Sequence, residues 1–206
     1  MLTINDQRLW ANLMELASIG GTASGGVCRV TLTDEDRAGR EWFVRRCEAL
    51  GCVVHIDPMG NLFARRQGKQ LERLPVMMGS HLDSQPTGGK FDGAYGVLAA
   101  LEVVQTLNDH GVVTDAPLEI VSWTNEEGAR FAPAMIGSGV FAGEFSLDYA
   151  YSRQDSEGVR LGDALRSIGY VGESPLGRRL YAAAFELHIE QGPILEAAAK
   201  SIGIVT

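Results

Sequence analysis

Apolar positions recur along the chain with two different periods, which predict helices that alternate with strands. Spacing of three or four residues predicts helices from the Asn5–Asp6 cap to Gly20, from the Thr33 cap to Gly51, and at residues 95–109 and 159–168. Short apolar runs or strict alternation predict strands. The predicted strands cover residues 52–57, 61–65, 74–78, 118–124 and 181–189. A further strand is predicted to begin at residues 201–206.

The order of these elements predicts an α/β fold with a mixed, mainly parallel sheet flanked by helices. A turn at Pro58-Met59-Gly60 separates the predicted strands at 52–57 and 61–65, which indicates an antiparallel hairpin. The polar, glycine-rich segments 79–93 and 128–146 predict loops and irregular structure. The sequence ends inside an apolar run, so we expect a chain that continues beyond residue 206.

Composition narrows the classes of partner. The formal net charge is −8, which argues against nucleic acid and anionic membranes as partners. The first residues lack the basic and apolar regions of a secretory leader. The three cysteines form no CxxC pair, so reduced thiols in a cytoplasmic protein are the simplest interpretation.

Three polar clusters each follow a predicted strand. The first is His81-Leu82-Asp83 together with Asp92, the second is residues 125–127, and the third is residues 188–191. In an open α/β sheet, binding sites form beyond the carboxyl ends of the strands. We therefore expect all three clusters to meet at one edge of the sheet.

The residue types in these clusters suit a hydrolytic metal pair. Imidazole and carboxylate groups bind zinc and similar ions, and a carboxylate such as Asp92 can bridge two of them. Asp83 lies two positions after His81 on an extended segment, so it is placed to orient a ligand. Adjacent carboxylates repel each other, but a metal beside Glu127 would leave Glu126 free to accept a proton.

Each cluster taken alone has a simpler interpretation. A histidine after a strand is more often a capped surface residue, and two adjacent glutamates more often form a solvated turn. Three such clusters at three strand ends favour a functional site instead. His55 and His110 lack such neighbours, so structural roles are expected for both, and Lys90 and Arg130 are expected to be surface charges rather than substrate ligands.

Three motifs resemble those of the zinc aminoacylase/peptidase superfamily, in the form of its hydantoinase/carbamoylase branch. GSHLDS at residues 79–84 with GGKFDG at 88–93 resembles the first metal motif, and TNEEGARF at 124–131 resembles the second. ELHIEQGP at 186–193 resembles the third, in which peptidase relatives usually carry an acidic ligand where this chain has His188. The resemblance extends from the first helix to the last residue.

The resemblance implies two divalent metal ions. His81 and His188 would bind one ion, Glu127 the other, and Asp92 both. Zinc is the first expectation, while manganese, cobalt and nickel also suit nitrogen and oxygen ligands. The last histidine ligand of the second ion is expected beyond residue 206.

The resemblance also implies catalytic and substrate-binding roles. Glu126 would be the general base, Asp83 would support Glu126 or His81, and Gln191 would face the substrate. Residues 1–206 would form the N-terminal part of the metal-binding catalytic domain. A lid domain that forms the homodimer and a C-terminal catalytic segment are expected beyond it.

The implied function is hydrolysis of a linear ureido C–N bond in a small substrate. The expected substrate is an N-carbamoyl-L-amino acid or N-carbamoyl-β-alanine, with amino acid, carbon dioxide and ammonia as products. The alternatives are an allantoate amidohydrolase and a metallo-aminopeptidase or deacylase of the same superfamily. An alternative of another class is a metal-binding fragment that is catalytically incomplete.

Overall fold

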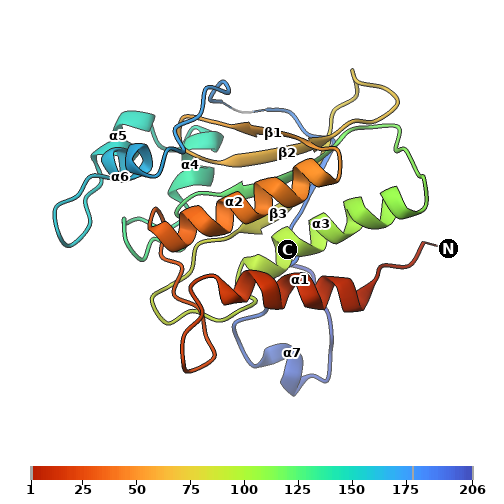
Figure 1. Cartoon of the computed structure of the whole chain (residues 1–206), viewed down its shortest axis with the longest axis horizontal. Coiled ribbons are helices and arrows are strands. Elements are labelled where there is room, and N and C mark those ends of the chain that lie inside the picture. Colours follow the sequence, from red (N-terminus) through yellow and green to blue (C-terminus); the bar gives the residue numbers. More distant parts are fainter. Residues whose placement is uncertain (1, 178, 206) are drawn as a thin grey trace.

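The computed structural model describes residues 2–177 and 179–205, which build one mixed sheet with helices packed around it (Figure 1). The strand order is β1-β2-β4-β3-β5. The hairpin strands β1 (Val53–Ile56) and β2 (Leu62–Arg66) are antiparallel, as predicted, and β2 is antiparallel to β4 (Leu118–Trp123). β3 (Val76–His81) runs parallel to both β4 and β5 (Ala183–Phe185). The mixed sheet is confirmed, and its parallel pairings, two of the four, lie in the half that contains β3.

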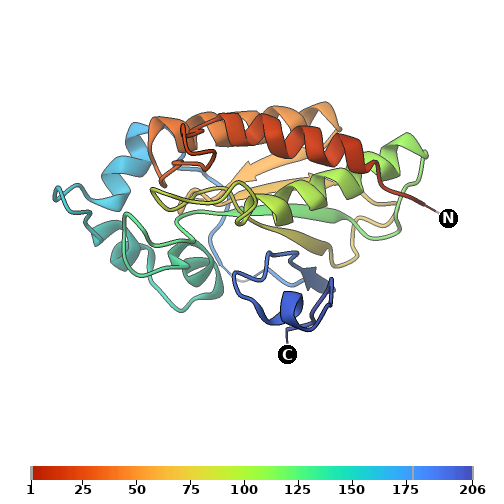
Figure 2. The same cartoon turned by 90° about the horizontal axis from the view of Figure 1, so that it is seen from below.

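Three long helices cover one face of the sheet (Figures 1 and 2). They are α1 (Asp6–Ser18), α2 (Asp34–Ala49) and α3 (Ala94–Asp109). The predicted caps are confirmed, because the Asn5 side chain accepts a hydrogen bond from the Arg8 amide and the Thr33 side chain accepts one from the Asp36 amide. The apolar sides of the helices and sheet form one core that includes the fully buried Phe43, Leu62, Leu98 and Ile120.

A glycine-rich segment predicted to be irregular contains a helix, so that prediction was wrong in part. α4 (Ile136–Ala142) lies within residues 128–146. Glycine disfavours helix interiors, which hid this helix in the sequence. A Cβ at Gly137 would lie 2.3 Å from the Thr124 carbonyl oxygen, so the glycine lets the helix approach the end of β4. α5 (Leu147–Ser152) was also not predicted, and α6 (Leu161–Ser167) falls inside its predicted range.

The strands predicted near the C-terminus are shorter than expected or absent from the described residues. β5 spans three residues and α7 (Ile194–Ala197) is one short turn of helix. Residues 201–205 form no strand, because no described strand pairs with them, and Ile204 is 88% exposed. The predicted last residue, Thr206, lies outside the described residues. β3, by contrast, continues to His81 because Gly79 to His81 stay paired with β4.

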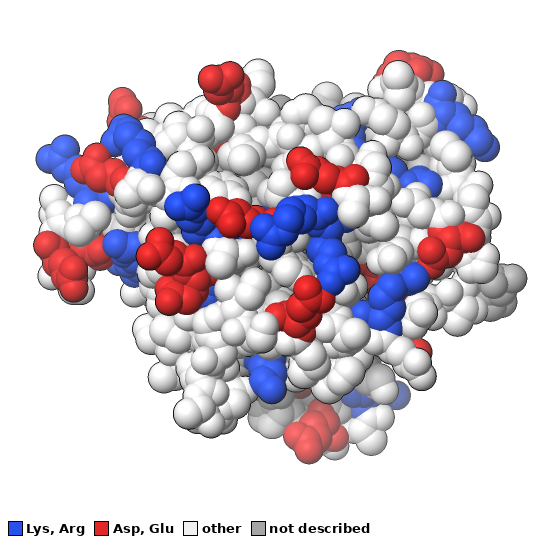
Figure 3. All heavy atoms as spheres, in the orientation of Figure 1, with Lys and Arg blue, Asp and Glu red and all other residues white. Residues whose placement is uncertain are grey.

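The charged side chains of the helical face are mixed rather than segregated (Figure 3). Arg37 pairs with Glu41 within α2, and Arg46 of α2 pairs with Glu15 of α1. No helix in the described part of the chain combines the length and the apolar character that a membrane crossing requires.

A buried carboxylate anchors α1 to α3. Glu102, 1% exposed, accepts hydrogen bonds from the Arg8 guanidinium at 2.8 and 2.7 Å, from the Asn5 amide at 2.9 Å and from the Thr106 hydroxyl at 2.9 Å. Burial alone would raise the pKa of Glu102, but these donors outweigh it and hold the pKa below its ordinary value. Arg8 also pairs with the half-exposed Asp109.

Glu102→Gln is expected to lower the free energy of unfolding by about 1.5–3 kcal/mol, because one oxygen that accepts from Arg8 becomes an amide nitrogen. Asp109→Asn, the matched control on the same arginine, should change it by less than about 1 kcal/mol. Since the native pKa of Glu102 is lowered, its contribution is present above the ordinary pKa and is lost as pH falls. Urea titrations at neutral and acidic pH test this, and equal effects of the two variants would contradict the anchoring role.

Candidate metal centre

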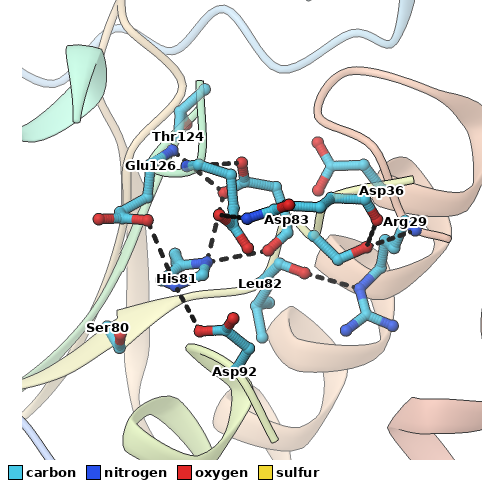
Figure 4. Close-up of polar contacts among 12 residues, drawn as sticks. Arg29, Asp36, Ser80, His81, Leu82, Asp83, Asp92, Thr124 and Glu126 are labelled. Atoms are coloured by element: carbon cyan, nitrogen blue, oxygen red, sulfur yellow. Dashed lines mark hydrogen bonds and ion pairs between the residues drawn. The ribbon is translucent and has the colours of Figure 1, made fainter. Parts of the chain in front are cut away.

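The ends of three adjacent parallel strands bring the predicted site residues together, and Figure 4 shows His81, Asp92 and Glu126 among them. His81 is the last residue of β3, and Glu126 and Glu127 follow β4. His188 lies three residues after β5. The predicted convergence of the three clusters at one sheet edge is therefore what the structure shows.

Two imidazoles and one carboxylate form a compact group. Asp92 Oδ1 lies 3.3 Å from His188 Nε2 and 3.8 Å from His81 Nε2. One ligand atom from each of the three residues lies within 4.8 Å of the other two. The His81 side chain is 2% exposed, that of Asp92 11% and that of His188 30%. Two nitrogens and one oxygen at this separation fit a zinc-type ion.

A glycine permits the close approach of His81 to the loop that carries Asp92. Gly93 has a φ of +61°, and a Cβ there would lie 2.4 Å from the His81 ring. Any side chain at this position would both strain the backbone and displace the imidazole. The first motif therefore needs a glycine next to its aspartate.

Asp83 joins the first two motifs. Its carboxylate is buried and accepts hydrogen bonds from the amides of Glu126 at 3.2 Å and Glu127 at 3.3 Å. Its main-chain carbonyl lies 2.9 Å from His81 Nδ1, and its Oδ1 lies 3.7 Å from the same nitrogen. This partner on Nδ1 leaves His81 Nε2 directed at Asp92 and Glu126, which is the arrangement expected of a metal-binding imidazole.

Burial and charge shift the pKa values of three side chains in this cluster. Burial raises the pKa of Asp83 to about 6, against the opposing effect of His81. Burial lowers the pKa of His81, but the charges of Asp83 and Glu126 outweigh it and raise the pKa overall. Burial and the neighbouring Glu127 raise the pKa of Glu126, while His81 opposes them.

Glu126 and Glu127 are adjacent but differ in their surroundings. Glu126 Oε2 lies 3.4 Å from His81 Nε2, beside the group of three. Glu127 lies outside that group. Its Oε2 accepts a hydrogen bond from the Gln85 side chain at 3.1 Å, and its Oε1 is buried with no hydrogen-bond partner among the described residues. Because buried polar atoms are almost always paired, this free oxygen fits a cation that binds there.

Two contacts at the site were not predicted from the sequence. Gln191 Nε2 donates a hydrogen bond to Asp92 Oδ2, so this residue contacts a predicted metal ligand, and its role in substrate binding stays a prediction. Ser80 Oγ donates to Glu186 Oε1 and ties the segment that leads to His188 onto β3. The motif at residues 186–193 contained Glu186, but its partner was not evident without the fold.

The remaining histidines lie outside this cluster. His55 is exposed on β1 and His110 is exposed at the end of α3, so neither is part of the group. Arg130 is more than the surface charge that was expected. It bonds to Asp155 at 3.0 Å and to the Leu32 carbonyl at 2.9 Å, and so has a structural role.

Comparisons with known proteins agree with this geometry. Peptidase family M20/M25/M40 matches residues 77–205, which contain all three motifs. An N-carbamoyl-L-amino-acid amidohydrolase of Rhizobium meliloti is 55% identical over 98% of this chain and 49% of its own length. One of Geobacillus stearothermophilus is 44% identical over 98% of this chain and 50% of its own length.

A solved structure also resembles this chain closely. A hydantoinase/carbamoylase family amidase from Burkholderia ambifaria has a TM-score of 0.97 at 59% identity, over the whole of this chain and 50% of its own. The chain thus spans about half the length of the proteins that it matches. On the family match and these likenesses, the chain belongs to peptidase family M20/M25/M40 and is similar within it to the hydantoinase/carbamoylase amidases.

Proposed function

We propose that this protein is a metal-dependent amidohydrolase that cleaves the linear ureido C–N bond of N-carbamoyl-L-amino acids. The observation that carries the proposal is the group formed by His81, Asp92 and His188, with Glu126 beside it. The 55% identical relative, an N-carbamoyl-L-amino-acid amidohydrolase, supports the substrate class. His188 stands where an acidic ligand is usual in peptidase relatives, which favours an amidohydrolase over an aminopeptidase.

The residues present fit two metal ions unequally. His81, Asp92 and His188 would hold the first ion, while Asp92 and Glu127 would contribute to the second. Divalent ions at such a site supply Lewis-acid chemistry, which polarises a carbonyl group and makes water a better nucleophile. A hydrolytic zinc site uses about three protein ligands, so we propose that the second ion takes a further ligand from outside these 206 residues.

Glu126 is proposed to move the proton. Its raised pKa and its place beside the metal ligands suit a carboxylate that accepts a proton from water as the water attacks the ureido carbonyl carbon. The C–N bond then breaks, and Glu126 returns the proton to the leaving ammonia. The remaining N-carboxy amino acid loses carbon dioxide to give the free amino acid.

Asp83 is proposed to fix Glu126 for this task without touching the substrate. It holds the amides of residues 126 and 127 through its carboxylate and His81 through its carbonyl. Such partners of ligands and bases set their orientation. We also propose, from the resemblance alone, that the whole protein is a homodimer.

A panel of ureido compounds and peptides tests the proposed function. Purified whole protein loaded with Zn²⁺ or Mn²⁺ should release ammonia from N-carbamoyl-L-amino acids and should leave simple dipeptides intact. Faster cleavage of dipeptides would assign the protein to the peptidases instead. Faster ammonia release from allantoate would keep the ureido chemistry and change the substrate.

A further inference from the structure

A buried arginine bonds to the turn that joins His81 to Asp83. Arg29, on the segment between α1 and α2, is 2% exposed, and its guanidinium donates hydrogen bonds to main-chain carbonyls alone among the described residues. Its Nε donates to the Leu82 carbonyl at 2.7 Å, and its Nη1 donates to the carbonyls of Ile19 at 2.8 Å and Leu16 at 3.1 Å. Among residues 2–177 and 179–205 it forms no ion pair, which is unusual because buried charges are normally paired.

The acceptors of Arg29 explain its position. Leu82 is the residue between His81 and Asp83, so the shortest of these bonds fixes the peptide that links the two (Figure 4). The main chain of Arg29 forms hydrogen bonds with Ser84, the residue that follows Asp83. The Arg29 amide donates to Ser84 Oγ at 2.8 Å, and the Arg29 carbonyl accepts from the Ser84 amide at 2.8 Å. Arg29 therefore holds the residues before and after Asp83.

The surrounding structure accommodates this arginine at a cost. Burial lowers the pKa of Arg29, and the charges of Asp36 and Asp83 act in the opposite direction. Gly39 lies inside α2, where a Cβ would be 2.8 Å from Arg29 Cδ. Glycine lowers the stability of a helix interior, so α2 is less stable at Gly39 than it would be with alanine there.

We propose that Arg29 is a positioning residue that holds the His81–Asp83 turn in the geometry that metal binding requires. The inference rests on the proposed metal centre, but it concerns a residue outside the three motifs. Through Leu82 and Ser84 it fixes the imidazole ligand and the carboxylate that joins the Glu126 loop to β3. Loss of a group that bonds directly to a metal ligand typically weakens metal affinity by about 10–100-fold. Arg29 bonds to the residue next to the ligand, so we expect an effect near the lower end of this range.

The matched control is a second buried arginine far from the site. Arg66, 9% exposed, donates to the Val112 carbonyl at 2.6 Å and to Asn108 Oδ1 at 3.0 Å. It pairs with Leu118, at the end of β4 opposite to Glu126. Replacing Arg66 by methionine also removes a hydrogen bond from a partly buried carbonyl, so it measures the effect of general destabilisation.

Zn²⁺ affinity of the folded protein, measured by competition with a chromogenic chelator, tests the proposal. Arg29→Met should bind Zn²⁺ about tenfold or more weakly than the wild type, and Arg29→Lys should recover part of the loss. Arg66→Met should stay within about twofold. Equal affinities of Arg29→Met, Arg66→Met and the wild type would overturn the proposal.

Gly39→Ala decides the question if Arg29→Met does not fold. It removes no hydrogen-bonding group and improves helix propensity, but its methyl group pushes on Arg29. A folded Gly39→Ala protein should therefore bind Zn²⁺ more weakly than the wild type, and unchanged affinity would overturn the proposal. These tests measure Zn²⁺ affinity and not ureido hydrolysis. If the whole protein were inactive but the variants showed the expected Zn²⁺ affinities, the proposed function would be refuted and the role of Arg29 would still hold.

Discussion

Replacing Glu126 by glutamine is expected to lower the turnover of the whole protein by about 10²–10⁴-fold, the usual scale for loss of a general base. The amide has nearly the same size as the carboxylate but cannot accept the proton of the attacking water. Glu126 lies outside the group formed by His81, Asp92 and His188, so the variant should keep its metal. Ammonia release from an N-carbamoyl amino acid and elemental analysis measure the two effects.

Glu127→Gln is the matched control for this prediction. The two residues are adjacent, and their amides share the carboxylate of Asp83, yet only Glu127 has a buried carboxylate oxygen without a partner. Glu127→Gln should therefore lose metal as well as activity. Metal loss in Glu126→Gln with retained metal in Glu127→Gln would show that the two roles are reversed.

Asp92→Ala is expected to remove more bound metal than any other single substitution. One oxygen of Asp92 lies within 3.8 Å of both His81 Nε2 and His188 Nε2, and the residue is proposed to bridge both ions. Without it, the two imidazoles lose the only acidic member of their group. Asp109→Ala makes the same change at an exposed aspartate of α3 and should leave the metal content unchanged.

Elements with strong local signals could be predicted from the sequence. α1 and α2 begin at the expected caps because Asn5 and Thr33 bond to amides of the first turn, an interaction between close neighbours in the chain. The β1–β2 hairpin is likewise local, since its strands are joined by a short turn at Pro58 to Gly60. In each case the deciding contacts lie within a few residues.

Elements decided by distant contacts could not be predicted. Gly79 favours a loop by local propensity, but β3 continues through it and stays paired with β4. The two strands lie so close at this point that a Cβ on residue 79 would be 2.1 Å from the Val121 carbonyl oxygen, so only glycine fits. Gly137 in α4 is similar, since its close neighbour is Thr124 of the β4 end. Neither close approach is visible before the sheet is assembled.

The candidate site shows the same division. The types and order of His81, Asp92 and His188 predicted the cluster, because strand ends of a parallel sheet share an edge. The contacts that support the cluster depend on the fold. Asp83 bonds to amides 43 and 44 residues away, and Gln85 reaches Glu127 across 42 residues. Sequence spacing alone does not pair such groups.

The metal content of the 206-residue chain tests the central claim most directly. After Zn²⁺ loading and gel filtration, elemental analysis of the wild-type chain should find about one tightly bound ion, since among the described residues one group offers three candidate ligands. Asp92→Ala, treated in the same way, should retain almost none. Equal zinc content in the wild type and Asp92→Ala would contradict the metal centre formed by His81, Asp92 and His188.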